Sequence, residues 1–463
     1  MPRLFTSALS RGEREERRQL YKSLFALVVP IAVQNLLSAL VNSADILMLG
    51  CIGQDELSAV SLANQYMFIL WGFFYGINSA TTLMNAQYWG KGDMRAIQAV
   101  FGIALKLSAL ITTLVAAGCI LLPDRLMRLY TDNAALVEIG EVYLRTIGIS
   151  YLIMTFAQVY QCTLRSVEQA RKSTVISAIT VLTNVVLNAV FIFGLFGAPK
   201  LGVRGVALAT VIARVLEFII CFVDCLRGKL FKPDLKLMFG RHRQLESDFA
   251  RYALPALGND LSWTLAFSTY SIILGHLSSD MVAASSVAST IRELFTTLCF
   301  GIGSGGTVIL GKELGANQPE RARKDASTLC WLTFLVTAFF GLLIVLLRRP
   351  VMGFFSLSDT AFGYLNIMLI ISGYYVVGQA MNTLLIAGVF RAGGNTRFGL
   401  ICDTVTMWCV SVPLGFLTAF VLKWPPMVVY FILCLDEFWK VPAVWKYYKS
   451  EKWVNNITRE DAV

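Results

Sequence analysis

The sequence predicts an all-α membrane protein whose twelve transmembrane helices form two six-helix bundles related by a parallel internal repeat. The first observation is compositional: 56% of the 463 residues are hydrophobic and only 15% are charged. In soluble domains roughly 45–50% of the residues are hydrophobic and about 25% are charged. The second is a succession of apolar stretches, and the third is a match between the two halves of the chain. So much apolar surface cannot be hidden inside a globule of this size, which excludes a soluble enzyme.

Each predicted span is a continuous apolar run of at least about 20 residues, which is the length that crosses a bilayer as a helix. A transmembrane strand would instead alternate over about ten residues, so helices are predicted throughout. The twelve spans are 24–50, 59–85, 99–122, 140–163, 173–197, 203–226, 250–277, 284–311, 326–347, 363–390, 397–422 and 426–448. They divide the chain into an N-terminal tail (1–23), a bundle (24–226), a basic linker (227–249), a second bundle (250–448) and a C-terminal tail (449–463).

The basic residues predict the orientation. If the N-terminus is placed inside, 29 Lys and Arg residues of tails and loops fall inside and 7 fall outside. Because cytoplasmic loops carry the excess of Lys and Arg, both termini are expected to face the cytoplasm. This placement also accounts for the net charge of +10 without nucleic acid as a partner.

Shifting the chain against itself by 225 residues aligns its halves. Pro30 then falls on Pro255, Gly50 on Gly275 and Gly90 on Gly315. Six spans per half is an even number, so the halves enter the membrane from the same side and are related by an axis along its normal. Parallel repeats of this kind are a transporter architecture with substrate handled between the halves. An old duplication in a membrane protein that does not transport is the alternative.

Several segments resemble the family of multidrug and toxic compound extrusion (MATE) transporters. They are Pro30, Gln34, Asn42-Ser-Ala-Asp45 and Gly50 in the first span, the loops Gln87-x-x-Gly90-x-Gly92 and Gly311-x-x-x-Gly315-Ala316, and Arg391-Ala-Gly-Gly-Asn-Thr-Arg397. The resemblance covers nearly the whole chain. It implies efflux of organic cations or drugs by alternating access, driven by protons or sodium.

A polar face in the first half is the predicted cation-coupling site. At about 100° per residue, Gln34, Asn42 and Asp45 share one side of a helix. The fifth span carries a second stripe, in which Asn184 and Asn188 lie at a depth similar to that of Thr210 in the sixth. We therefore predict a polar cavity lined by Asp45, Asn184, Asn188, Thr210, Asn42 and Gln34, where the carboxylate exchanges a proton or the oxygens coordinate Na⁺. The alternative is that Asp45 bonds a neighbouring helix and the amides act as interhelical glue.

The second half has its own intramembrane charges, which are functional candidates by default. Opposed signs predict ion pairs between Arg292 and the acids Asp260, Glu293, Asp403, Asp436 and Glu437. The alternative is that one carboxylate faces the central cleft and attracts a cationic substrate. The cleft candidates are Asp260, Trp263, Tyr270 and Arg292, where aromatic rings stack on planar cations. Arg214, Glu217 and Asp224 are interpreted as structural residues that reach toward the cytoplasm.

Two other functions are alternatives to drug efflux. A flippase for lipid-linked oligosaccharides would need a cationic cleft. A membrane enzyme would need a clustered acidic or histidine motif, and the chain has only two His and no DDxxD sequence. We expect no enzymatic activity, no metal site and no cofactor besides the coupling ion, H⁺ or Na⁺. The expected partners are small organic substrates and the lipid bilayer, with the chain as a monomer in the plasma (inner) membrane.

Overall fold

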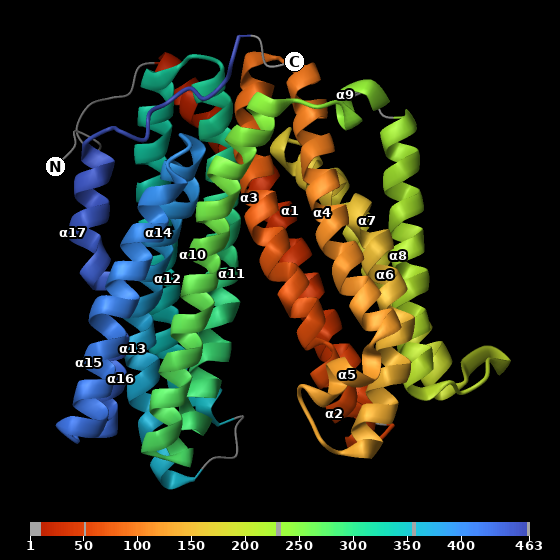
Figure 1. Cartoon of the computed structure of the whole chain (residues 1–463). Coiled ribbons are helices and arrows are strands. Elements are labelled where there is room, and N and C mark those ends of the chain that lie inside the picture. Colours follow the sequence, from red (N-terminus) through yellow and green to blue (C-terminus); the bar gives the residue numbers. More distant parts are fainter. Residues whose placement is uncertain (1–10, 51, 228–232, 354–357, 461–463) are drawn as a thin grey trace.

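The computed structural model describes residues 11–50, 52–227, 233–353 and 358–460. Every regular element in these ranges is helical, as the sequence predicts. The helices form two groups that lie side by side (Figure 1). We call the group α1–α8 the N-lobe and the group α10–α17 the C-lobe.

The N-lobe consists of long, regular helices. They are α1 (Arg11–Gly50), α2 (Gln54–Ala63), α3 (Gln65–Lys91), α4 (Met94–Leu121), the short α5 (Pro123–Arg128), α6 (Ala134–Ser166), α7 (Ala170–Phe193), a 3₁₀ turn (Leu195–Gly197) and α8 (Gly202–Arg227). In the segment between the lobes, the short helix α9 (Leu235–Phe239) packs against α4.

The C-lobe is less regular. It contains α10 (Arg243–Leu277), α11 (Ser279–Gly315), α12 (Pro319–Met352), α13 (Asp359–Thr383), α14 (Thr396–Thr404), α15 (Val412–Phe416), α16 (Pro426–Leu433) and α17 (Asp436–Lys449). Three π-helical segments continue these helices: η2 (Leu384–Phe390), η3 (Val405–Ser411) and η4 (Leu417–Val421). Each predicted span therefore corresponds to one helix or to a continuous pair or series.

Ten helical stretches among the described residues are long and apolar enough to cross a membrane. The two predicted spans outside this set have physical reasons to differ. The 250–277 span lies in α10, whose apolar run is interrupted by Asn259, Asp260 and several hydroxyl residues. The 426–448 span is divided into α16 and α17, each shorter than the roughly 20 residues that a crossing helix needs.

The internal repeat is visible in the turns as well as in the helices. Gly92, which ends α3, has φ +81°, and Asn317, 225 positions later, has φ +58°. Glu168 and Gly394, 226 positions apart, have φ +63° and +81°. Left-handed backbone is uncommon outside glycine, so its recurrence at matching positions supports two copies of one architecture.

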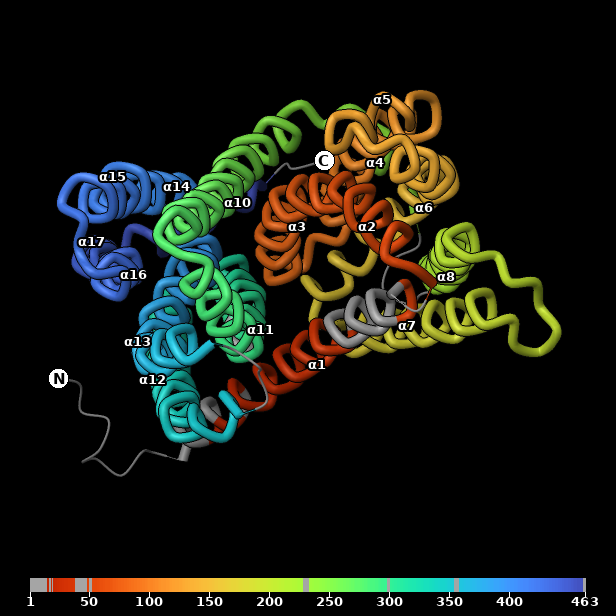
Figure 2. Tube along the Cα trace, turned by 90° about the horizontal axis from the view of Figure 1, so that it is seen from below, coloured from red at the N-terminus to blue at the C-terminus, as the bar shows by residue number. Residues whose placement is uncertain are grey.

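The lobes meet at one end, which we call the basic-loop end and define by the turns 92–93, 167–169, 316–318 and 391–395. There α3 packs against α11 so closely that a Cβ on Gly90 would collide with the Lys312 backbone, and one on Gly315 with the Gln87 backbone. Glu168 reinforces the junction by accepting from Lys312 Nζ at 2.6 Å and from Trp89 Nε1 at 3.1 Å. Toward the other end the lobes diverge (Figure 1), and the view from that end shows α1 reaching from the C-lobe helix α11 to α7 (Figure 2).

The C-terminal strap, defined as residues 450–460, lies across the basic-loop end. Gln87 of α3 donates to the carbonyl oxygens of Ala392 and Asn455 at 2.7 and 3.0 Å and accepts from the backbone N of Ile457 at 2.8 Å. Arg459 pairs with Asp248 of α10 at 2.7 and 3.0 Å. Trp453 is only 1% exposed. The described part of the predicted tail is therefore docked on both lobes.

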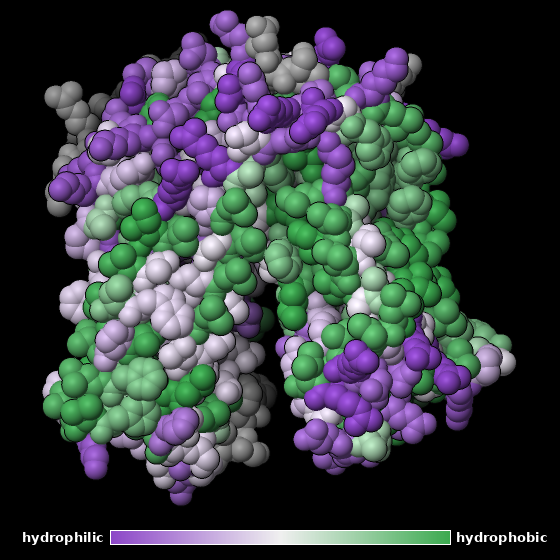
Figure 3. Space-filling model, in the orientation of Figure 1, coloured by the Kyte–Doolittle hydropathy of each residue, from purple (hydrophilic) through white to green (hydrophobic). Residues whose placement is uncertain are grey.

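Side chains on the outer surface suit a bilayer. Large apolar residues such as Leu114, Leu182 and Leu342 are more than half exposed, and a hydrophobic band lies between hydrophilic ends (Figure 3). Soluble monomers rarely expose large contiguous apolar patches. The molecule is a multi-pass membrane protein.

Candidate functional site

The polar stripe of α7 faces the interior of the N-lobe. Its five members are at most 8% exposed: Ser173, Ser177, Thr180, Asn184 and Asn188. Asn184 Nδ2 donates to Thr210 Oγ1 of α8 at 3.2 Å, and Asn188 Nδ2 donates to Asn184 Oδ1 at 3.4 Å. The structure thus brings together three residues of the predicted coupling site.

Gln34 connects α1 to this stripe. Its Nε2 donates to Ser177 Oγ at 2.7 Å. Asn42 and Asp45 belong to α1, but their side chains lie outside the described residues, so their roles remain a prediction. Asp45 is eleven residues beyond Gln34, and Asn188 is eleven beyond Ser177. Since α1 and α7 both run away from the basic-loop end, a rise of 1.5 Å per residue places both about 16 Å further from it.

Gln161 and Glu217 form the hub of the N-lobe network, and sequence reasoning missed this role. Gln161 Oε1 accepts from Ser177 Oγ at 2.8 Å, while its Nε2 donates to Glu217 Oε1 at 2.7 Å. Arg214 Nη1 binds the other oxygen of Glu217 at 2.7 Å. Glu217 is only 2% exposed, so the expectation that it reaches the aqueous phase was wrong. The opposite charges of Arg214 and Glu217, about one helical turn apart, could have predicted that these two residues form an ion pair.

A cleft separates the lobes at the end remote from the basic-loop end (Figure 3). Tyr75 of α3 is 64% exposed, and its hydroxyl lies within electrostatic range of Asp260 on α10 and Glu293 on α11. These three residues come from helices that pack together near Gly76, where an added Cβ would meet Leu257. Tyr75 was not among the predicted residues, although the neighbouring Gly76 could have indicated the crossing of α3 with α10.

The other predicted cleft residues make contacts with other side chains of the C-lobe. Trp263 packs on Phe267 with ring centroids 4.3 Å apart, and Tyr270 is only 7% exposed within the C-lobe core. The Arg292 guanidinium lies 4.6 Å from the ring centroid of Tyr375. Within the described part of the chain Arg292 has no carboxylate within ion-pair distance, so the predicted pairing is replaced by a cation–π contact.

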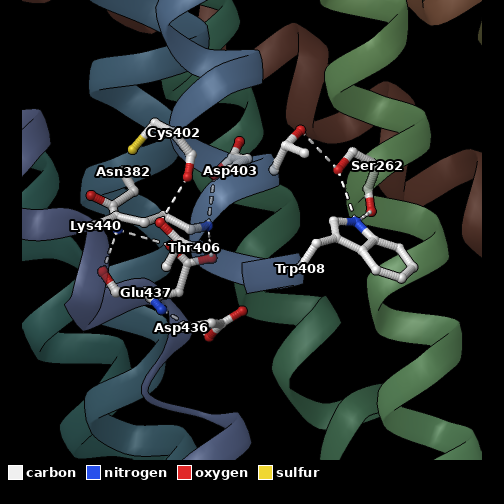
Figure 4. A network of polar contacts seen from close by, with 10 residues as sticks. Ser262, Asn382, Cys402, Asp403, Thr406, Trp408, Asp436, Glu437 and Lys440 are labelled. Carbon is white, nitrogen blue, oxygen red and sulfur yellow. Dashed lines mark hydrogen bonds and ion pairs between the residues drawn. The ribbon is translucent and has the colours of Figure 1, made fainter. Parts of the chain in front are cut away.

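Lys440 provides the ion pairs that were predicted for Arg292 (Figure 4). Its Nζ lies 2.8 Å from Asp403 Oδ1 and 3.2 Å from Glu437 Oε1, and the residue is 2% exposed. Asn382 Nδ2 donates to the carboxylate and the backbone oxygen of Glu437 at 2.8 and 2.7 Å. The 29 Lys and Arg residues placed inside include Lys440. That placement was wrong for this residue, because α13, α14 and α17 enclose its side chain.

A family model named MatE matches residues 30–190 and 255–417. The chain belongs to the MATE family of multidrug efflux transporters. The two matched ranges fall one in each lobe, as expected for an internally repeated MATE protein.

Relatives and solved structures agree with this membership. The chain is 23% identical over 436 residues to an uncharacterized transporter, YisQ, of Bacillus subtilis, covering 93% of this chain and 95% of that protein. It is 26% identical to the multidrug resistance protein PmpM of Pseudomonas aeruginosa, covering 88% and 85%. A crystal structure of a MATE protein in a bent conformation superposes with a TM-score of 0.84 at 19% identity, covering 96% and 98%. At that identity the structural likeness establishes the fold alone.

Proposed function

We propose that this MATE transporter exports organic cations by alternating access, in exchange for H⁺ or Na⁺. The observation that carries the proposal is the exposed Tyr75 of α3, which lies within electrostatic range of the carboxyl groups of Asp260 and Glu293. Two carboxylates attract a cation, and the face of an aromatic ring binds it further. A cleft of this chemistry favours positively charged, planar substrates.

The charges of the loops predict the side of the membrane to which the cleft opens. If the basic-loop end faces the cytoplasm, as the excess of Lys and Arg predicts, the cleft opens toward the outside. This is the state from which an exporter releases its substrate. The contacts of Gly90 and Gly315, together with the Glu168–Lys312 pair, close the cytoplasmic side.

The N-lobe supplies the coupling site in this proposal. Asp45 lies on α1 at the height of Asn188, beyond the bond that joins Gln34 to Ser177. A carboxylate there exchanges a proton, or it coordinates Na⁺ together with the oxygens of Asn184, Asn188 and Thr210. One monovalent ion crossing about 150 mV supplies roughly 3.5 kcal/mol, which supports a substrate gradient of several hundredfold because each 1.4 kcal/mol is tenfold.

The test uses purified protein in liposomes with a pH gradient or a Na⁺ gradient imposed separately, and follows ethidium in the direction that reports export. We expect one gradient to drive ethidium movement. Asp45→Asn should remove the response to the gradient, whereas Asp260→Asn should weaken ethidium binding. Asp124→Asn, an exposed carboxylate paired with Arg128, is the matched control and should behave as the wild type.

Absence of ethidium movement under both gradients would overturn the proposal. Lipid-linked oligosaccharides would then be the next substrates to test. A flippase would need free cationic groups for a pyrophosphate, but Arg292 lies against Tyr375 and Lys440 is held by two carboxylates.

A further inference from the structure

The C-lobe encloses three carboxyl groups around one ammonium group. Asp403, Asp436, Glu437 and Lys440 are 5%, 0%, 2% and 2% exposed. Lys440 binds Asp403 and Glu437 directly, while Asp436 stands beside Glu437 (Figure 4). We call these four residues the Lys440 cluster. If all four were ionised, the cluster would carry a net charge of −2 away from water.

The surrounding helices supply one further positive charge. Arg292 of α11 lies within electrostatic range of Asp436. The other polar groups within range of the cluster are ordinarily neutral, and come from α10, α13, α14 and the turn after α16: Tyr270, Tyr374, Tyr375, Asn382, Cys402 and Cys434. Asp260 lies within electrostatic range of Asp403 and of Arg391, so these two neighbours add one charge of each sign. Three carboxyl groups therefore face two cations.

One proton restores neutrality, and Asp436 is the carboxyl group best placed to hold it. Asp403 and Glu437 each contact Lys440, whereas Asp436 makes no ion pair within the described ranges. Its Oδ1 accepts from the backbone N of Glu437 at 2.8 Å, and its Oδ2 is buried without a hydrogen-bond partner there. An ionised oxygen left without a partner in the interior is costly, so the neutral form is favoured.

The helices are irregular at this cluster. The π-helical segment η2 begins two residues after Asn382, η3 begins two residues after Asp403, and α17 begins with Asp436 after the break that ends α16. π-helical insertions occur frequently at functional sites, and transporters build ion sites from interrupted helices. In the N-lobe, α6, α7 and α8 carry their polar groups on uninterrupted α-helices.

We propose that the Lys440 cluster is a proton-binding site separate from the coupling site of the N-lobe, in which the Asp436 carboxyl group holds a proton and releases it during the transport cycle. On release the O–H bond of Asp436 breaks, its electron pair stays on the oxygen, and the proton passes to water on the side to which the transporter is then open. The cluster with Arg292 then carries one negative charge, which a substrate cation can offset. The role in transport rests on the proposed function, but the protonation does not.

Infrared spectroscopy of the purified wild type at neutral pH tests the protonation without transport, through the carbonyl stretch of neutral carboxylic acids. Asp436→Asn should lower the intensity of this band by the amount that one neutral carboxyl group contributes. Asp403→Asn should remove the same amount although Asp436 is intact, because two carboxylates then face two cations. Lys440→Gln should add one equivalent, and Asp124→Asn should leave the band unchanged.

The opposite directions expected for Asp403→Asn and Lys440→Gln keep the test decisive even if Asp436→Asn fails to fold. A band that Asp436→Asn and Asp403→Asn both leave intact would overturn the site. The transport role is tested in the liposome assay, where Asp436→Asn should lose at least half of the pH-driven ethidium movement. An unchanged rate in a variant that has lost the infrared band would overturn coupling through Asp436. If the wild type moves no ethidium, the proposed function is wrong. The infrared measurement still decides whether Asp436 holds a proton, because it does not depend on transport.

Discussion

The two lobes repeat one backbone plan but carry different interior chemistry. In the N-lobe the network uses amides and hydroxyls on regular helices, with Glu217 bound by both Gln161 and Arg214. In the C-lobe a buried ammonium is bound by two carboxylates where helices are interrupted. The left-handed turns at matching positions show that the copies kept their geometry. The two copies therefore share a backbone architecture, while the polar side chains inside them differ in chemistry.

The largest expected effect on transport tests whether both lobes contribute equally to closure of the basic-loop end. Gly90→Ala and Gly315→Ala each place a Cβ against the facing backbone, that of Lys312 or that of Gln87. Overpacking against atoms that cannot move aside costs about 3 kcal/mol, which lowers the population of the closed state about a hundredfold. Ethidium transport in liposomes should fall accordingly in both variants.

Gly72→Ala is the matched control, because its Cβ would have nothing within 4 Å in the same helix α3. It should transport as the wild type does. A loss confined to one of the two interface variants would break the symmetry of the comparison, since it would mean that one lobe alone determines closure.

The next prediction compares the loss of stability when a positive charge is removed from the interior of each lobe. Lys440→Met leaves Asp403 and Glu437 buried without their cation, which costs about 3–5 kcal/mol for a buried pair. Arg214→Met should cost only about 1.5 kcal/mol, typical of a hydrogen bond to a charged group. The Arg214 side chain is 20% exposed, and Glu217 retains Gln161. Thermal unfolding in detergent measures both.

Combining Lys440→Met with Glu437→Gln removes charges of both signs and should recover part of the stability lost in the single variant. Equal losses for Lys440→Met and Arg214→Met would contradict the view that only the C-lobe depends on a fully buried cation.

The smallest effect concerns the C-terminal strap, which joins the lobes at their shared end. Arg459→Ala removes an ion pair whose arginine side chain is 44% exposed, so we expect only a small loss of stability. Amide hydrogen exchange in residues 451–460 should accelerate by up to about fivefold. Arg128→Ala, which breaks the exposed pair with Asp124, should leave that exchange unchanged, and equal acceleration in both variants would refute a local effect of Arg459.

Residue spacing predicted those parts of the fold and site that depend on one helix at a time. The apolar runs locate the helices, and the period of about 3.6 residues exposes the α7 stripe from Ser173 to Asn188 as a polar face in an apolar span. Contacts between helices that are distant in the sequence produce no periodic pattern in the sequence. Tyr75 is one aromatic residue among many in its helix, and only the packing of α3 on α10 and α11 brings it toward Asp260. Lys440 lies near the end of an apolar run, where a lysine ordinarily extends to water, and the approach of α14 encloses it.

The strap has a kinetic consequence. It continues directly from α17, and within the C-lobe it is held by Arg323, which binds Glu451 at 2.9 Å, and by Asn395, which binds Lys452 at 2.8 Å. Its contacts with Gln87 of the N-lobe can therefore break while it stays attached to the C-lobe. A group tethered by a short segment meets its target at an effective concentration on the order of millimolar. Each return to the closed state is thus a ring closure within one molecule, independent of protein concentration.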